Sequence, residues 1–322
     1  MGRLEAMQAF VAVVEGQGFS AASRSLGIPL PTVSRWIVEL EQKLGTQLLM
    51  RSTRKVVVTD SGRQYYESVR RILESLVDAE IQAAGEYRNP RGQLTITAPA
   101  LFGRLHVLPI VSDFMASHPE ITARLHFSDF VTDLMEEHVD LGVRIGKLTD
   151  VSLIAAKVGE VRNFYCASPG YLAARGLPRH PEDLVKHDCI AFSKSGDPVP
   201  WPFRSPGQTQ QSMAVTPRLS VNTAEAAAEA AIAGGGITWL YSYQAAPHLA
   251  AGTLSAVLTE FEADPVPVSI VYPAGHLVPK KVRHFIDFAA ERLRKTLHEI
   301  NSRCSVALAS KSGSVGIELG HN

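Results

Sequence analysis

The N-terminal part of the chain shows apolar residues at helical spacing, interrupted by glycine and proline. The pattern predicts helices over residues 4–15, from Ser20 to Leu26, and from Pro31 onward. We expect Ser20 to cap the second helix and Pro31 to lie in the first turn of the third. Gly27 suits the left-handed turn between them. Three short helices with a tight middle turn form a helix-turn-helix module.

A short hairpin and a long helix are predicted next. Two apolar runs, 47–50 and 56–59, flank the basic segment 51–55, which indicates a hairpin with a basic tip, or wing. Thr59 can cap a following helix whose apolar residues alternate spacings of four and three. We expect this narrow seam to pair with a second copy of the chain; the alternative is packing against its own domain. The seam consists of Tyr65, Val69, Ile72, Leu76, Ala79 and Ala83.

The segment Arg88–Gly92 breaks this helix and starts a region of a different pattern. Strands and helices alternate there, which predicts parallel sheets covered by helices. From residue 300 the apolar pattern stops and Ser and Gly become frequent, so we expect a disordered tail over 300–322. The predicted strands are 94–98, 123–127, 141–144, 162–167, 189–192, 218–221, 236–240 and 269–272, and the predicted helices are 101–117, 132–137, 224–233 and 279–299.

Composition and charge limit the class of protein. The 322 residues suffice for about two domains, and 45% hydrophobic with 20% charged residues is typical of a globular protein. The net charge is zero, so a nucleic-acid site must be local; residues 1–63 hold eight Lys or Arg against five acidic residues, a local charge of +3. Without a signal-like start or a run of eighteen apolar residues, we expect a cytoplasmic protein with no membrane contact.

Features that could indicate catalysis or a cofactor have simpler interpretations. The glycine triplet 234–236 lacks the Lys-Ser/Thr of a phosphate loop and reads as a helix stop. Ser168 lies outside a GxSxG elbow and precedes a proline. The eleven histidines show no HxH or HExxH spacing, and the three cysteines are far apart. We expect no enzyme activity, no metal and no cofactor. The thiols are expected to be inert, and a redox role for them is the alternative.

The helix-turn-helix module carries polar residues where readout of DNA would need them. Its second helix enters the major groove with its first residues near base edges, where arginine can form a bidentate fork with guanine. The preceding helix and the wing would contact phosphates; the alternative is a solvated helix face with a charged loop. The candidates for base contacts are Leu30, Pro31, Thr32, Ser34, Arg35 and Trp36, and those for phosphate contacts are Ser20, Ser23, Arg24, Arg51, Arg54 and Lys55.

Taken together, these motifs resemble the LysR-type transcriptional regulator family over residues 1–299. The N-terminal motifs are highly specific in combination, and the later ones resemble one large branch of the family. The segments that carry the resemblance are Phe19–Ala22, Leu26–Ile28, Thr32–Arg35, Leu40–Glu41, Leu44–Gly45, Leu48–Leu49, Arg51–Arg54 and Thr59–Gly62, then Thr97–Pro99, Phe102–Gly103, Leu108–Pro109, His118–Pro119, Asp140–Gly146, Cys166–Pro169, Gly234–Ile237 and Pro279–Val282.

The resemblance implies a multidomain fold: an all-α winged helix-turn-helix, a long linker helix, and an α/β effector domain of two Rossmann-like halves. The effector domain would resemble type II periplasmic binding proteins, the chain crossing twice between halves, near 159–161 and 263–268. The expected ranges are 1–60 for the DNA-binding domain, 61–90 for the linker and hinge, and 91–299 for the effector domain, with half I at 91–160 plus 268–299 and half II at 161–267.

The function implied is that of a regulator that binds a double-stranded DNA operator as a homodimer or homotetramer. It would respond to a small molecule and activate or repress nearby genes, with RNA polymerase as a further partner. Ligands of such folds bind near strand C-termini and helix N-termini, and Arg144 or a helix N-terminus could hold a carboxylate, so we expect a small organic acid. The matching positions are Thr97, Ala98, Pro99, Phe102, Ser128, Arg144, Gly146, Asn222 and Thr223.

Two residues depart from the family pattern. Pro29 stands where the family often has Ser or Thr as the cap of the recognition helix. Tyr241 replaces a common proline after the strand that follows the glycine triplet. A competing hypothesis is a small-molecule binding or transport-like protein whose N-terminal module is incidental.

Overall fold

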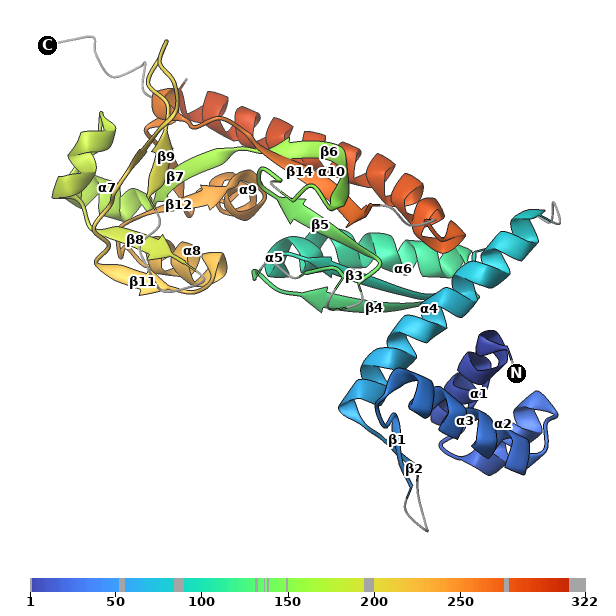
Figure 1. The fold of residues 1–322 in the computed structure, drawn as a ribbon. Coiled ribbons are helices and arrows are strands. Elements are labelled where there is room, and N and C mark those ends of the chain that lie inside the picture. Colours follow the sequence, from blue (N-terminus) through green and yellow to red (C-terminus); the bar gives the residue numbers. More distant parts are fainter. Residues whose placement is uncertain are drawn as a thin grey trace, which may run out of the picture. The chain divides into compact units, whose positions relative to one another are not determined.

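The structure is a computed structural model that forms two compact units (Figure 1). The first unit comprises residues 1–92 with 277–283, and the second comprises 93–276 with 284–322. No helix within the described ranges is both long and apolar enough to cross a membrane. The residues that the structure describes are 2–51, 56–83, 90–130, 133–135, 137, 139–148, 150–193, 200–274 and 278–312.

The first unit is a three-helix module with a two-stranded wing and a long helix. Gly27 has φ +67° and ends the second helix in the left-handed conformation, as predicted. The prediction that Ser20 caps this helix is wrong, because Gly18 is the N-cap and its carbonyl already accepts the N–H of Ala22 at 3.1 Å. The elements are α1 (Arg3–Glu15), α2 (Phe19–Leu26), α3 (Leu30–Leu44), β1 (Leu49–Arg51), β2 (Val56–Val58) and α4 (Asp60–Ala83).

The wing is tied to α4 by hydrogen bonds of the Thr59 side chain and by a close approach of Gly62. The Oγ1 of Thr59 accepts the N–H of Gly62 at 2.9 Å, which confirms the predicted cap, and donates to the carbonyl of Gln47 at 2.8 Å. Gly62 lies so close to the wing that a Cβ there would stand 2.0 Å from the carbonyl oxygen of Leu48. The antiparallel pair β1 and β2 therefore begins from a fixed position against α4.

The apolar seam of α4 divides into two parts. Tyr65 lies 5.5 Å from the ring of Phe10 between centroids, and Val69 is fully buried, so the first part packs within the module. Further along the helix, the side chain of Ile72 is 51% exposed. The first part of the seam thus packs within its own domain, and beyond it the apolar side chain of Ile72 is left largely exposed.

Half I of the second unit contains a five-stranded sheet in the order β4-β3-β5-β14-β6. β3 and β5 are parallel as predicted, whereas β14 runs antiparallel to both β5 and β6. The parallel expectation fails there because the chain returns from half II as a strand and not through a helical crossover. The elements are β3 (Gly92–Ala98), α5 (Ala100–Phe102), the π-helical turn η1 (Gly103–Val107), α6 (Leu108–Ser117), β4 (Ile121–Phe127), β5 (Leu141–Ile145), β6 (Leu153–Val161), β14 (Val266–Pro273) and α10 (Lys280–Ser312).

Two helix predictions for half I have different outcomes. The helix predicted over 101–117 is present as the continuous run of α5, η1 and α6. The helix predicted over 132–137 lies partly outside the described residues, and Leu134 and Met135 form a turn.

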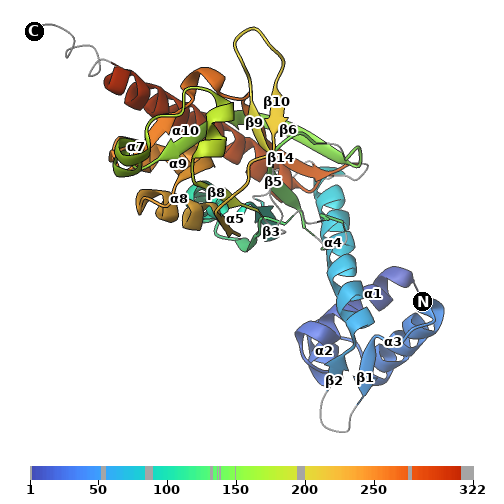
Figure 2. The ribbon, with the colours of Figure 1, turned by 90° about the vertical axis from the view of Figure 1, so that its left-hand side faces the viewer.

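Half II has a second five-stranded sheet in the order β11-β8-β12-β7-β13. A separate hairpin of β9 and β10 projects from it (Figure 2). β11, β8 and β12 are parallel, while β7 and β13 are antiparallel to their neighbours. The elements are β7 (Asn163–Ala167), α7 (Pro169–Arg175), η2 (Pro181–Lys186), β8 (Cys189–Phe192), β9 (Trp201–Phe203), β10 (Gln211–Met213), β11 (Leu219–Val221), α8 (Ala224–Ile232), β12 (Ile237–Tyr241), α9 (Ser242–Ala250), β13 (Ser255–Val257) and η3 (Thr259–Phe261).

The chain crosses between the halves twice, as the resemblance implied. β6 ends in the first sheet at Val161 and β7 starts in the second at Asn163. The return runs from η3, which ends at Phe261, to β14, which starts at Val266. Both crossings are short segments outside helices and strands, so they can act as paired connectors between two sheets.

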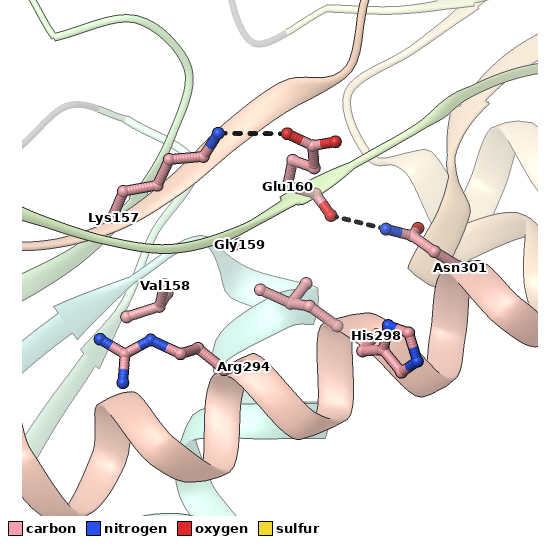
Figure 3. A pocket seen from close by; sticks show the side chains of 8 residues that line it. Lys157, Val158, Gly159, Glu160, Arg294, His298 and Asn301 are labelled. Atoms are coloured by element: carbon pink, nitrogen blue, oxygen red, sulfur yellow. Dashed lines mark hydrogen bonds and ion pairs between the residues drawn. The ribbon is translucent and has the colours of Figure 1, made fainter.

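The prediction of a disordered tail is wrong for residues 300–312, which continue α10. The Nδ2 of Asn301 donates to the carbonyl of Glu160 at 3.0 Å (Figure 3), beside a groove of about 470 Å³, and Cys304 is fully buried in the core of half II. The polar residues that suggested disorder, such as Arg303, form the exposed face of an amphipathic helix. Residues 313–322 lie outside the described part of the chain.

Candidate DNA-reading and effector sites

Helix α3, the predicted recognition helix, begins without a side-chain cap. Pro29 is the N-cap residue, and its carbonyl accepts the N–H of Thr32 at 2.8 Å and that of Val33 at 3.1 Å. An N-cap side chain usually accepts the N–H of the second or third helical residue; here the second is Pro31, which has no N–H, and the third is Thr32, whose N–H is already bonded to the Pro29 carbonyl. A side-chain cap at position 29 would therefore find no unpaired donor of this kind.

One face of α3 is buried and the opposite face carries the candidate base contacts. Val33, Ile37 and Leu40 are buried in the core of the module. The side chain of Arg35 is 68% exposed, and its Nε lies 3.8 Å from Glu39 in a weak ion pair on the same helix. Leu30 and Pro31 are exposed, Thr32 and Ser34 are half-buried, and Trp36 packs partly against the core.

The candidate phosphate contacts on α2 differ from one another. Ser20 and Arg24 are exposed, whereas the Oγ of Ser23 donates to the carbonyl of Ile28 at 2.6 Å and closes the turn before α3. Arg54, Lys55 and the side chain of Arg51 lie outside the described residues.

Glu41 is a positioning residue that our sequence analysis missed. Its Oε1 accepts the N–H groups of Leu48 at 2.8 Å and Leu49 at 3.0 Å, which anchors the first wing strand to α3. The pair Leu40–Glu41 in the family motif was the available signal, but only the structure shows that Glu41 accepts hydrogen bonds from Leu48 and Leu49.

The candidate effector residues of half I gather at the ends of β3 and β4. Thr97 is fully buried, and its Oγ1 finds no hydrogen-bond partner among the described residues. The carbonyl of Ala98 accepts the N–H of Ser128 at 3.0 Å, so the two loops adjoin. Pro99 caps the helical run that contains the buried Phe102.

Arg144 is the cation of this group. Its side chain is half-buried at the end of β5, and burial lowers the pKa of the guanidinium while the Glu137 carboxylate opposes that shift. Gly146 follows with φ +133° and donates its N–H to the carbonyl of Pro267 at 3.0 Å. A guanidinium at the end of a strand is suited to a carboxylate ligand.

On half II, the two candidates occupy the start of α8. Thr223 is the N-cap, and its Oγ1 accepts the N–H of Ala226 at 3.2 Å. Asn222 is exposed beside it. Thr223 thus has a structural role that is sufficient to explain its position.

Side chains of the two halves meet at a lobe border that our sequence analysis did not identify. The Phe102 ring lies 5.2 Å from Tyr243 and the His106 ring 5.9 Å from it, while Arg104 pairs with Glu225 of α8 at 3.9 Å. Burial lowers the pKa of His106 to about 4. The border places Phe102, a candidate from half I, in contact with half II.

Comparison with known families decides what these two units are. Residues 4–63 match a family described as bacterial regulatory helix-turn-helix proteins of the LysR family, and residues 88–294 match the LysR substrate binding domain. The chain belongs to the LysR-type transcriptional regulators. In this family the N-terminal module binds DNA and the second unit is the effector-binding domain.

Relatives of this LysR-type regulator are similar over nearly the whole chain. An HTH-type transcriptional regulator of Xanthomonas campestris pv. campestris is 34% identical over 96% of this chain and 91% of its own length. The structure of CrgA from Neisseria meningitidis is 31% identical, covers 90% of this chain and 98% of its own, and has a TM-score of 0.58. The structure of the Vibrio cholerae virulence activator AphB is 29% identical, covers 90% of this chain and 99% of its own, and has a TM-score of 0.57.

Proposed function

We propose that this LysR-type regulator places α3 in the major groove of a partly palindromic operator and controls nearby genes in response to a small organic acid. The observation that supports DNA reading most directly is the position of Arg35. It projects from the first half of a helix whose other face is buried, with 68% of its side chain exposed. Such a side chain reaches base edges when the N-terminal half of the helix enters the groove.

The remaining DNA contacts follow from position on α2, α3 and the wing. Leu30, Pro31, Thr32 and Ser34 accompany Arg35 near base edges, with Trp36 at the margin because its ring also packs on the core. Phosphate contacts are proposed for Ser20, Ser23, Arg24, Arg51, Arg54 and Lys55.

The effector is proposed to bind at the lobe border, where a buried hydroxyl and a half-buried cation belong to the same sheet. Thr97 on β3 has an unpaired Oγ1 among the described residues, and Arg144 ends the adjacent strand β5. A carboxylate could accept hydrogen bonds from both groups. The further proposed contacts are Ala98, Pro99, Phe102, Ser128, Gly146, Asn222 and Thr223.

Assembly into a homodimer or homotetramer is proposed to use the uncovered part of α4 around Ile72. Two copies related by a two-fold axis would read half-sites about a helical turn or more apart. Action on chromosomal DNA in the cytoplasm, activation or repression, and contact with RNA polymerase complete the proposal.

Footprinting of the DNA upstream of the neighbouring operon, with and without candidate organic acids, tests this function. We expect a protected, partly palindromic site whose occupancy or extent changes with the effective acid. Salt-sensitive but sequence-independent binding would contradict the proposed operator, and protection that no organic acid alters would contradict the proposed effector class.

The variant Thr97→Val tests the effector site separately. It removes a hydroxyl that has no partner among the described residues, so stability and operator affinity should not fall, while the response to the acid is lost. Thr238→Val is the matched control, because Thr238 is equally buried and also lacks a described partner but lies on β12 of half II. A normal response in Thr97→Val removes Thr97 from the site.

A further inference from the structure

Six aromatic side chains form a connected row from half I into half II. The row begins with Phe102 and His106, whose rings lie 4.9 Å apart, and both contact Tyr243. It continues from Tyr243 to Tyr241 at 6.3 Å, to Trp239 at 5.5 Å and to Phe192 at 6.0 Å. The row therefore starts at the lobe border and extends across the strand ends of half II.

The rings differ in how much of their surface is covered. Phe102 and Tyr243 are buried and already fill the contact between the halves. Phe192, Trp239 and Tyr241 are half-buried, so each of these residues keeps part of its surface exposed to solvent. Partly exposed aromatic residues favour a ligand whose own ring can cover their apolar surface.

Trp239 is held in a fixed orientation at the crossings between the halves. Its Nε1 donates to the Oδ1 of Asn163 at 3.0 Å, and the Nδ2 of Asn163 donates to the carbonyl of Asp264 at 2.9 Å. Asn163 is 1% exposed and follows the first crossing, whereas Asp264 lies on the second. A rigid indole binds a planar ring with little loss of side-chain entropy.

The candidate residues of the two halves also differ in chemistry. Half I supplies hydroxyls and a cation through Thr97, Ser128 and Arg144, while half II supplies the rings of Trp239 and Tyr241. We propose that the effector is an aromatic carboxylic acid, with its ring against Tyr241 and Trp239 and its carboxylate toward Thr97 and Arg144. This inference rests on the proposed function, in which the effector is an organic acid bound at this border. It specifies further that the acid carries an aromatic ring.

Matched acids test the inference on the full-length protein. Benzoate, 4-hydroxybenzoate and cyclohexanecarboxylate have a carboxylate on a six-membered ring, but the last lacks a π-system; hexanoate and succinate represent acyclic acids. Isothermal titration calorimetry gives the affinity for each acid. We expect the tighter-binding of benzoate and 4-hydroxybenzoate to bind roughly two- to tenfold more tightly than cyclohexanecarboxylate for each ring contact.

Ring variants then identify the surface involved. Tyr241→Leu should weaken binding of the better aromatic acid by about tenfold, whereas Tyr241→Phe should retain it because the ring remains. Tyr272→Leu is the control: Tyr272 is also half-buried on a strand, β14, but is not in the row. Operator affinity without acid should be unchanged in Tyr272→Leu, and retained acid affinity in Tyr241→Phe would assign the loss in Tyr241→Leu to the missing ring.

The outcomes separate this inference from the proposed function. Equal or tighter binding of cyclohexanecarboxylate, hexanoate or succinate overturns the aromatic class and leaves an organic-acid effector standing. Unchanged aromatic affinity in Tyr241→Leu overturns the assigned surface. Binding of none of the five acids overturns the aromatic inference and also removes support for the organic-acid class, while DNA reading remains to be judged by the footprint.

Discussion

Arg162 and Glu262 join the two crossings between the halves of the effector domain. The Nε and Nη2 of Arg162 donate to the two carboxylate oxygens of Glu262 at 2.7 and 2.5 Å, and Nη1 donates to the Oγ of Ser305 at 2.9 Å. The side chains are only 23% and 20% exposed, and the hydrogen bonds with Glu262 raise the pKa of Arg162. The crossings are therefore connected by a bidentate pair in a partly desolvated position.

Replacing Glu262 by Gln should destabilise the effector domain, because a half-buried guanidinium loses its counter-charge. We expect a loss of about 2 kcal/mol in urea unfolding. Asp264→Asn is the matched control, since Asp264 pairs with Arg204 at 2.7 Å but both side chains are more than half exposed. Its loss should stay below about 1 kcal/mol, and equal losses would contradict a special role for Arg162.

Replacing Gly62 by Ala should disrupt the junction between wing and linker helix. The added Cβ would meet the Leu48 carbonyl oxygen at 2.0 Å, and neither backbone can move without disturbing its element. We expect a loss of more than about 2 kcal/mol, seen as a lower temperature at which operator binding fails. Gly18→Ser should leave that temperature unchanged or raise it slightly, because Gly18 is an N-cap with open space around it.

Arg35 and Arg24 should respond differently to replacement by Ala. Loss of Arg35 should cost about 1–3 kcal/mol on the operator and little on scrambled DNA, because a base contact carries sequence information. Loss of Arg24 should weaken both DNAs alike and lower the salt slope by about one, as expected for a phosphate contact. Dissociation constants on both DNAs at several salt concentrations provide the comparison; uniform weakening by Arg35→Ala would exclude it from base readout.

Ile72→Glu should weaken self-association through α4. Ile72 is 51% exposed within an otherwise apolar seam, and a carboxylate at a helix–helix contact must be desolvated without a partner. Analytical ultracentrifugation should show a shift toward monomer. Val57→Glu changes a similarly exposed apolar residue, 50%, on the wing and should leave the oligomer intact; no shift in Ile72→Glu would place the interface elsewhere.

His106 should make the effector domain less stable in acid. Burial lowers its folded-state pKa to about 4 from the ordinary 6.5, so the unfolded chain binds more protons between these values. This contribution to stability is complete above about pH 6.5 and is lost as the pH falls toward 4. Unfolding curves of His106→Gln should show a smaller loss over this range, whereas His126→Gln, an exposed position on β4, should follow the parent protein.

Much of the local structure could be predicted because its signals are local. The left-handed turn at Gly27, the Thr59 cap and the strand Cys189–Phe192 follow from turn chemistry and short apolar periods. The same rules failed for residues 300–312, since a polar helix face resembles a disordered segment until the surface that covers its other face is known. Tertiary burial of Cys304 and the bond from Asn301 decided that case.

The sequence by itself determined the family, the order of modules and the buried face of α3, because these depend on motifs within a few turns of chain. Only the tertiary structure showed that Phe102 meets Tyr243, that Trp239 is fixed by Asn163, and that Glu41 holds the wing. Trp239 and Tyr241 alternate along β12, which was a signal for one shared face, but not for what that face meets. Contacts between distant segments depend on how the chain crosses between the two sheets, and the local spacing of apolar residues does not specify this path.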